Sequence, residues 1–234
     1  NWAGTRVSRN LVLGNRRSGI FIEIGNFRTD DPASPVPDEE RMLVDHNIVG
    51  FSRPSTTGHD VLKGSGIVLH SASGVTVAHN LVFQNPQRGV TVACEIGRIA
   101  GNEYPARSAH NRVFYNVLVE NGTHFWANSH PKLVTGNRFD YNILQKASAG
   151  DQPLRGPNDA KISVGAKLDR ETCVLELSVN GENLVRGPRL VEEMEKDFLG
   201  RPLSDDVVPG PFADWSPDHG RFDLGRHHEL PLQR

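Results

Sequence analysis

Val77-Ala78-His79-Asn80-Leu81-Val82 is one of five similar blocks in this chain of 234 residues. Each block places an asparagine before two aliphatic residues, and successive asparagines are 37, 33, 36 and 26 residues apart. Repetition with periods of this size is typical of solenoid proteins, in which each repeat stacks on its neighbour. The other four blocks are Val7-Ser8-Arg9-Asn10-Leu11-Val12, Val44-Asp45-His46-Asn47-Ile48-Val49, Val113-Phe114-Tyr115-Asn116-Val117-Leu118 and Phe139-Asp140-Tyr141-Asn142-Ile143-Leu144.

A second short strand follows most of these blocks, and its first copy is Ser18-Gly19-Ile20-Phe21-Ile22-Glu23. Short apolar strands without helical periodicity favour an all-β fold, a right-handed parallel β-helix, in which equivalent residues lie about 4.8 Å apart. The asparagines of the five blocks should then form an internal ladder of amide hydrogen bonds. Three segments align with Gly19–Glu23 position by position: Gly66-Ile67-Val68-Leu69-His70, Gly89-Val90-Thr91-Val92-Ala93 and Phe125-Trp126-Ala127-Asn128-Ser129.

The repeats divide the chain into two parts. Residues 1–145 are expected to form the coils, and further coils are expected before Asn1 because the chain begins inside a repeat without a polar cap. Residues 146–234 are expected to hold a linker, an antiparallel hairpin within 160–187 that packs on the solenoid, and an extended tail. Residues 190–198 fit a short helix or a strand equally well.

Composition narrows the possible partners. The chain has 26 basic and 28 acidic residues, so it lacks the positive charge expected of a nucleic-acid-binding surface. It has no apolar run of about 20 residues that could cross a membrane, which predicts a soluble protein. Cys94 and Cys173 are expected to be free thiols, so a secreted, periplasmic or cytoplasmic location all remain open. The oligomeric state also stays open, with a homo-oligomer among the options.

Alternation along the Ser18–Glu23 strand directs Phe21 and Glu23 outward if Ile20 and Ile22 face the core. On the next coil His70 takes the position of Glu23, so the two side chains should be neighbours on one exposed face. Three insertions, around residues 26–41, 52–63 and 98–107, border this face. Two carboxylates on adjacent coils would be about 5 Å apart, the separation used by retaining glycosidases. A solvated surface acid is the alternative interpretation of Glu23.

Other residues are weaker candidates. Glu95 could be a second carboxylate about 10 Å from Glu23, although a solvated acid fits it better. Trp2, Phe21, Tyr104 and Trp126 could offer flat faces to sugar rings, with core packing the usual fate of a residue placed like Trp126. Arg16 and Arg17 could bind a uronate carboxylate or be solvated. An outward column beside the asparagines is expected to stack and stabilise the coils rather than bind metal or substrate: Arg9, His46, His79, Tyr115 and Tyr141.

About the first 25 residues of the chain carry a family resemblance. The run Trp2-Ala3-Gly4-Thr5-Arg6-Val7-Ser8-Arg9-Asn10-Leu11, followed by Gly19-Ile20-Phe21-Ile22-Glu23-Ile24, resembles part of the catalytic region of the β-xylosidases of glycoside hydrolase family 120, within the pectate-lyase-like superfamily. The resemblance implies that Glu23 is the general acid/base. It implies a nucleophilic aspartate near the start of this chain or just before it, a role Asn1 cannot fill because an amide lacks an anionic oxygen.

Together these observations predict a carbohydrate-active enzyme without a cofactor. The first hypothesis is a retaining glycoside hydrolase on β-xylosides or related plant cell-wall glycosides, with Trp2, Phe21, His70 and Glu95 contacting substrate. The second is a polysaccharide lyase on a uronate-containing polymer, with a Lys, Arg or His base and Ca²⁺ to hold the acid group. The third is a carbohydrate-binding solenoid without catalysis.

Overall fold

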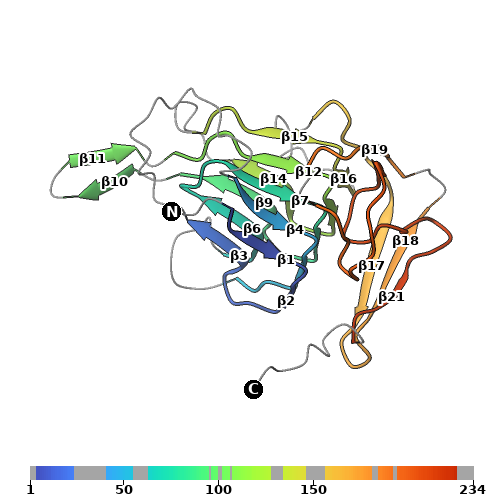
Figure 1. Ribbon diagram of the computed structural model, residues 1–234. Coiled ribbons are helices and arrows are strands. Elements are labelled where there is room, and N and C mark those ends of the chain that lie inside the picture. Colours follow the sequence, from blue (N-terminus) through green and yellow to red (C-terminus); the bar gives the residue numbers. More distant parts are fainter. Residues whose placement is uncertain are drawn as a thin grey trace, which may run out of the picture.

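The computed structural model describes residues 4–23, 41–54, 63–94, 107–127, 134–145, 156–180, 184–191 and 194–225, and the backbone of 96–99 and 102–105. Within these residues three parallel sheets stack coil upon coil, with a small antiparallel sheet beside them (Figure 1). This is a parallel β-helix with a C-terminal antiparallel appendage, as the repeats predict.

The three parallel sheets form the walls of the β-helix. Sheet A has the order β1-β4-β7-β12-β15, with strands Arg6–Ser8, Met42–Asp45, Val75–Ala78, Arg112–Phe114 and Arg138–Asp140. Sheet B has the order β16-β13-β8-β5-β2, with strands Ile143–Leu144, Val117–Val119, Leu81–Phe83, Ile48–Gly50 and Leu11–Leu13. Sheet C has the order β14-β9-β6-β3, with strands Thr123–Ala127, Arg88–Ala93, Ser65–His70 and Ser18–Glu23.

The remaining strands are antiparallel. The C-terminal sheet has the order β17-β18-β21, with strands Val164–Asp169, Val174–Val179 and Arg221–Asp223. Two pairs complete the list: β10 with β11 (Ile96–Ile99, Asn102–Pro105) and β19 with β20 (Gly187–Pro188, Asp206–Val207). The predicted hairpin is therefore present as β17 and β18, whereas β21 was not anticipated. No helix or named strand covers the described part of 190–198.

Aliphatic side chains from all three walls fill the interior. Sheet A contributes Val44 and Val77, and sheet C contributes Ile67 and Leu69, all fully buried in one cluster. Sheet B is apolar on both faces, because Val82 points into this core while Leu81 and Phe83 belong to a second cluster outside it. Continuous apolar triplets such as Leu81-Val82-Phe83 are the sequence signature of a strand covered on both sides.

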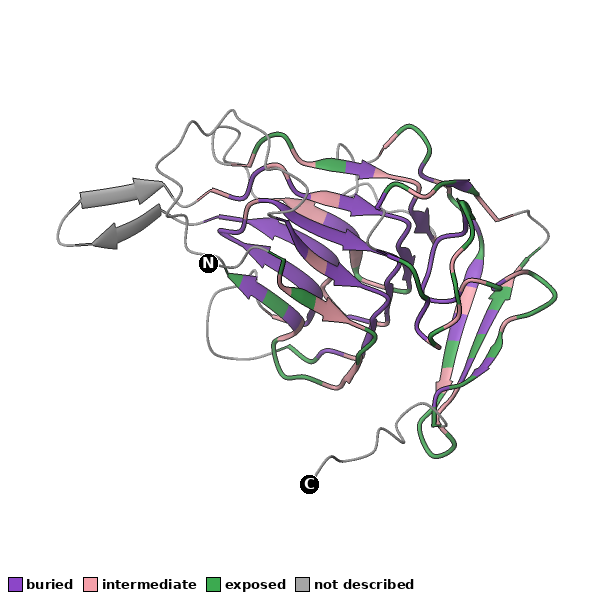
Figure 2. Cartoon of the chain, viewed as in Figure 1, coloured by how far each residue is buried: buried purple, intermediate pink, exposed green. Residues whose placement is uncertain are grey.

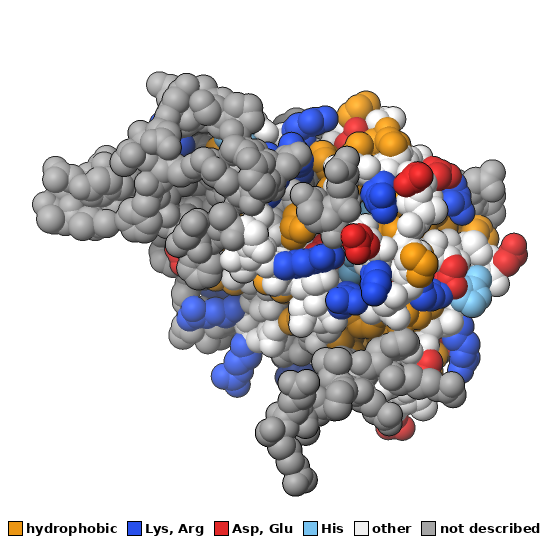
Figure 3. All heavy atoms as spheres, viewed as in Figure 1, with side chains coloured by type: hydrophobic (Ala, Val, Ile, Leu, Met, Phe, Trp, Pro, Cys, Tyr) orange, Lys and Arg blue, Asp and Glu red, His pale blue; other side chains and the backbone are white. Residues whose placement is uncertain are grey.

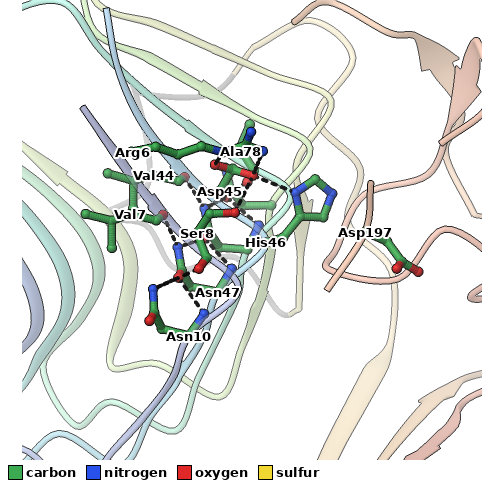
Figure 4. A network of polar contacts seen from close by, with 12 residues as sticks. Arg6, Val7, Ser8, Asn10, Val44, Asp45, His46, Asn47, Ala78 and Asp197 are labelled. Atoms are coloured by element: carbon green, nitrogen blue, oxygen red, sulfur yellow. Dashed lines mark hydrogen bonds and ion pairs between the residues drawn. The ribbon is translucent and has the colours of Figure 1, made fainter. Parts of the chain in front are cut away.

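The predicted asparagine ladder is present and continues further than expected. Each ladder amide donates to the side-chain oxygen of the next asparagine at 2.9–3.0 Å, and Figure 4 shows the first of these bonds, from Asn10 to Asn47. Asn142 at the far end donates to Oδ1 of Asp159 at 3.0 Å. Asp159 thus ends the ladder, although the sequence assigned it to a linker.

Glycine is the second residue of β3, β6 and β9, because the chain passes close to sheet B there. A Cβ atom on Gly19 would lie 2.2 Å from Val49 Cγ1, and one on Gly66 would lie 2.4 Å from Val82 Cγ1. The expected alignment holds for β3, β6 and β9 but is wrong by one residue in β14, where Phe125 pairs with Val90 rather than with Gly89. Phe125 is therefore in the core and Trp126 is on the outer face.

The C-terminal segment packs against sheet B and the turn between sheets A and B. Phe212, Trp215 and Phe222 share the second apolar cluster with Leu81 and Phe83 of sheet B. Figure 1 accordingly shows β17, β18 and β21 beside the β-helix, on the opposite side from β3.

This packing buries part of the outward column of side chains. Rings of His46, His79, Tyr115 and Tyr141 stack with centroids 4.9–5.0 Å apart, as expected of residues that stabilise coil pairing. His46, His79 and Tyr115 are nevertheless buried, and the Tyr115 hydroxyl donates to the Pro188 carbonyl at 2.7 Å. The column is thus outward from the β-helix but covered by the C-terminal segment.

Candidate active site

Glu23 is the last residue of β3, which stands at one end of the strand order of sheet C among the described residues. Ile20 and Ile22 are buried while Phe21 and Glu23 are exposed, so the predicted alternation is correct, and Figure 2 shows the change of colour along β3. About half of the Glu23 side chain, 53%, is exposed. A carboxyl group in this place can reach a molecule in solution.

His70 is the neighbour of Glu23 on the next coil. The two residues are partners in the parallel pairing of β3 with β6, and Nδ1 of His70 lies 3.1 Å from Oε1 of Glu23. The ring of His70 also stacks on Phe21, with centroids 5.7 Å apart and planes inclined by 30°. The expected adjacency of Glu23 and His70 is therefore confirmed.

The exposed face is narrower than the sequence indicated. His70 is buried, and so are Val68, Thr91 and Ala93 on the outer face of β6 and β9. Among the described outer residues of sheet C, exposure is concentrated in Phe21 and Glu23 on β3. The expectation that His70 faces solvent is wrong, because the outer face is covered from the second coil onward.

The described residues do not place the other predicted substrate contacts beside Glu23 and His70. Trp2 and Glu95 lie outside them, and Tyr104 belongs to β11, of which only the backbone is described. Arg16 and Arg17 are exposed in the bend before β3.

Trp126 lies on the outer face at the other side of sheet C. It pairs with Thr91, which pairs with Val68, which pairs with Phe21, so these residues form one column across four coils. The Arg88 guanidinium carbon is 3.9 Å from the centre of the Trp126 ring, a cation–π contact. An alignment of Phe125 with the core residues Ile20, Ile67 and Val90 would have predicted this outward position of Trp126.

A buried charged cluster around Asp45 was missed by the sequence reasoning. Two guanidinium nitrogens of Arg6 donate to the two carboxylate oxygens at 2.7 and 2.6 Å, and Ser8 Oγ and His46 Nδ1 lie 3.0 and 2.9 Å from Oδ2 (Figure 4). Burial raises the pKa of Asp45, but the hydrogen bonds from His46 and Arg6 outweigh it and bring the pKa to about 2. Because Asp45 is fully buried on sheet A, the cluster ties β1 to β4 and does not face substrate.

Surface features add little to the choice of site. Acidic and basic side chains of the described residues are interspersed on the face in Figure 3. Across the described ranges, no group of three or more His, Cys, Asp and Glu side chains is placed to share a metal ion. The same ranges contain no helix of sufficient length and apolarity to cross a membrane. Cys94 and Cys173 form no disulfide within the described residues, as expected.

Comparison with known proteins places this geometry in context. No protein-family model and no curated protein sequence matches the chain. A solved structure described as the complex of XylC with xylose matches 94% of this chain with a TM-score of 0.52 and 15% sequence identity. The two chains share a fold. This chain spans 39% of the length of that XylC chain, so the likeness concerns the β-helix and its appendage and not the whole of XylC.

Proposed function

We propose that this chain forms part of a retaining glycoside hydrolase that acts on β-xylosides, with Glu23 as the general acid/base. The observation that carries the proposal is the placement of Glu23: a half-exposed carboxyl group at the end of β3, hydrogen-bonded to a buried histidine. The resemblance of its strand to family 120 β-xylosidases and the fold shared with the xylose-bound XylC support the same assignment.

The second carboxylate belongs on the other side of Glu23. A retaining glycosidase needs its two carboxyl groups about 5 Å apart, which is about the distance between adjacent coils. On the β6 side Glu23 meets His70, which is not a carboxylate. We therefore place the nucleophilic aspartate on a coil preceding β3, in residues N-terminal to Asn1.

The reaction then has two steps. Glu23 donates its proton to the glycosidic oxygen as the bond to the anomeric carbon breaks, and the aspartate forms a covalent bond to that carbon. In the second step Glu23 takes a proton from water, the water oxygen bonds to the anomeric carbon, and the aspartate leaves as a carboxylate. Glu23 is thereby protonated again for the next cycle.

Replacement of Glu23 by glutamine tests the assignment in the full polypeptide. Glu23→Gln keeps the size of the side chain but removes the transferable proton, so hydrolysis of xylobiose should fall at least about 10²-fold. Glu171→Gln, an exposed acid in the turn between β17 and β18, is the matched control and should keep full activity. Unchanged xylobiose hydrolysis by Glu23→Gln would reject the role of Glu23.

Two further assays of the full polypeptide separate the alternative classes. A lyase would release a product with a new double bond, detected by its ultraviolet absorbance, from a uronate polymer in the presence of Ca²⁺. A carbohydrate-binding protein would retain xylobiose without cleaving it.

A further inference from the structure

His70 contacts two residues of the neighbouring strand, Phe21 and Glu23, which are two positions apart. Phe21 and Glu23 point to the same face of β3, because side chains at positions i and i+2 share a face. The imidazole of His70 lies against both, with Nδ1 at 3.1 Å from the Glu23 carboxylate and its ring stacked on Phe21. One side chain of β6 therefore touches both exposed groups of β3.

Burial differs sharply across this contact. The His70 side chain is 7% exposed and the Glu23 side chain 53% exposed. Packing restricts a buried side chain to one arrangement, whereas a half-exposed carboxylate at the end of a strand has several rotamers available. The histidine is thus the fixed partner, and the hydrogen bond selects one rotamer of Glu23.

We infer that His70 is a positioning residue that orients the acid/base carboxyl group and supports Phe21 as an apolar platform for the sugar of the leaving group. The inference rests on the proposed function and adds a role for His70. With its proton on Nδ1, the ring donates to Oε1 of Glu23. Oε2 is then left to carry the proton that passes to the glycosidic oxygen. Phe21, 40% exposed, presents the other side of its ring to the substrate.

Two substitutions separate the two contacts. His70→Phe keeps an aromatic ring against Phe21 but has no N–H for Glu23. His70→Asn keeps a donor close to the position of Nδ1 but has no ring to support Phe21. Both variants are made in the full polypeptide, and their melting temperatures are compared with that of the unmodified protein.

Two substrates distinguish positioning of the acid from general damage. Xylobiose has a poor leaving group and needs the proton, whereas 2,4-dinitrophenyl β-xyloside has a leaving group that departs without it. For His70→Phe we expect kcat/KM on xylobiose to fall about 10²-fold, while kcat/KM on the aryl xyloside, which reports only the step that releases the leaving group, falls less than about threefold. For His70→Asn we expect kcat on xylobiose to be largely kept and KM to rise about 2- to 10-fold, the value of one aromatic contact.

Each outcome decides the inference. Equal losses of kcat/KM on both substrates in His70→Phe, or an unchanged kcat/KM on xylobiose, would overturn it. If His70→Phe does not fold, an unchanged KM in His70→Asn would overturn it as well. A Glu23→Gln variant with full activity, or an unmodified protein that cleaves neither substrate, would instead remove the proposed function together with the inference. An inactive Glu23→Gln beside a fully active His70→Phe would remove the inference alone.

Discussion

His79 is an uncharged histidine held between two aromatic rings and beneath the C-terminal segment. Its ring stacks on His46 on one side and on Tyr115 on the other. Burial, and then the charge of His46, lower its pKa from 6.5 to about 3, against the opposing effect of hydrogen bonding to the backbone of Gly210 and Val208. At this residue the contact between the β-helix and the appendage therefore depends on a neutral imidazole.

This depressed pKa predicts that acid weakens the fold. Between pH 6.5 and 3 the unfolded chain binds a proton at His79 that the folded chain does not, so the free energy of unfolding falls as the pH falls. From pH 7.5 to 5 the loss due to His79 should be about 2 kcal/mol. His79→Phe keeps a stacked ring without a titrating group. From pH 7.5 to 5 its free energy of unfolding should fall by about 2 kcal/mol less than that of the unmodified protein, as measured by urea unfolding.

The control for this experiment is a histidine that is open to water. The side chain of His219 is 56% exposed, and His219→Gln leaves the burial of His79 unchanged, so this variant should keep the acid sensitivity due to His79. If His79→Phe and the unmodified protein lose stability in parallel from pH 7.5 to 5, His79 is not a source of acid sensitivity.

At the scale of the element, the asparagine ladder fixes the register of the coils. Within the coil of β7 and β8, Asn80 donates to Asn116 and to the carbonyls of Val44 and Ala78, and its Oδ1 accepts from the backbone and side chain of Asn47. Because Asn80 is fully buried, its hydrogen-bond partners cannot bind water in its place.

Removing one rung should therefore cost more in the middle of the ladder than at its end. Asn80→Ala leaves several buried donors and acceptors without partners, each worth about 1–3 kcal/mol, so we expect a loss of at least about 3 kcal/mol. Asn10 is exposed in this chain of 234 residues, so Asn10→Ala in the same chain is the matched variant and should cost about 1 kcal/mol. Denaturant unfolding measures both, and equal losses would mean that the ladder does not contribute through burial.

Much of this architecture follows from the sequence because a β-helix repeats its signals in every coil. The Asn blocks predicted the ladder, and alternation in Ser18–Glu23 placed Glu23 outward. Asp159 was missed because the coil it belongs to lacks the block, and Trp126 was misplaced because His124 stands where β6 and β9 have glycine. The burial of His46, His79 and His70 depends on contacts with distant segments, which repeat periodicity does not encode.

At the scale of the whole molecule, the appendage and the β-helix share apolar surface. Phe212 is buried, and its ring lies on that of Phe222 with centroids 3.7 Å apart, within the cluster that also contains Leu81 and Phe83 of sheet B. Continuous packing of this kind predicts that the two parts unfold as one cooperative unit.

Phe212→Ala tests that coupling. Truncation of a buried phenylalanine should lower the free energy of unfolding by about 3–5 kcal/mol. Tryptophan fluorescence, to which the buried Trp215 contributes, and far-UV circular dichroism should shift to lower denaturant together. A fluorescence transition that moves while the circular dichroism transition stays in place would show that the appendage unfolds by itself.

The most direct measurement of the central claim, that Glu23 is the acid/base of a glycoside hydrolase, is rescue of Glu23→Ala by azide. The full polypeptide carrying this substitution is given 2,4-dinitrophenyl β-xyloside with and without sodium azide. The account predicts that azide, which needs no general base to attack, restores turnover and yields β-xylosyl azide. Full hydrolysis of xylobiose by Glu23→Ala, with neither rescue nor an azide product, would contradict it.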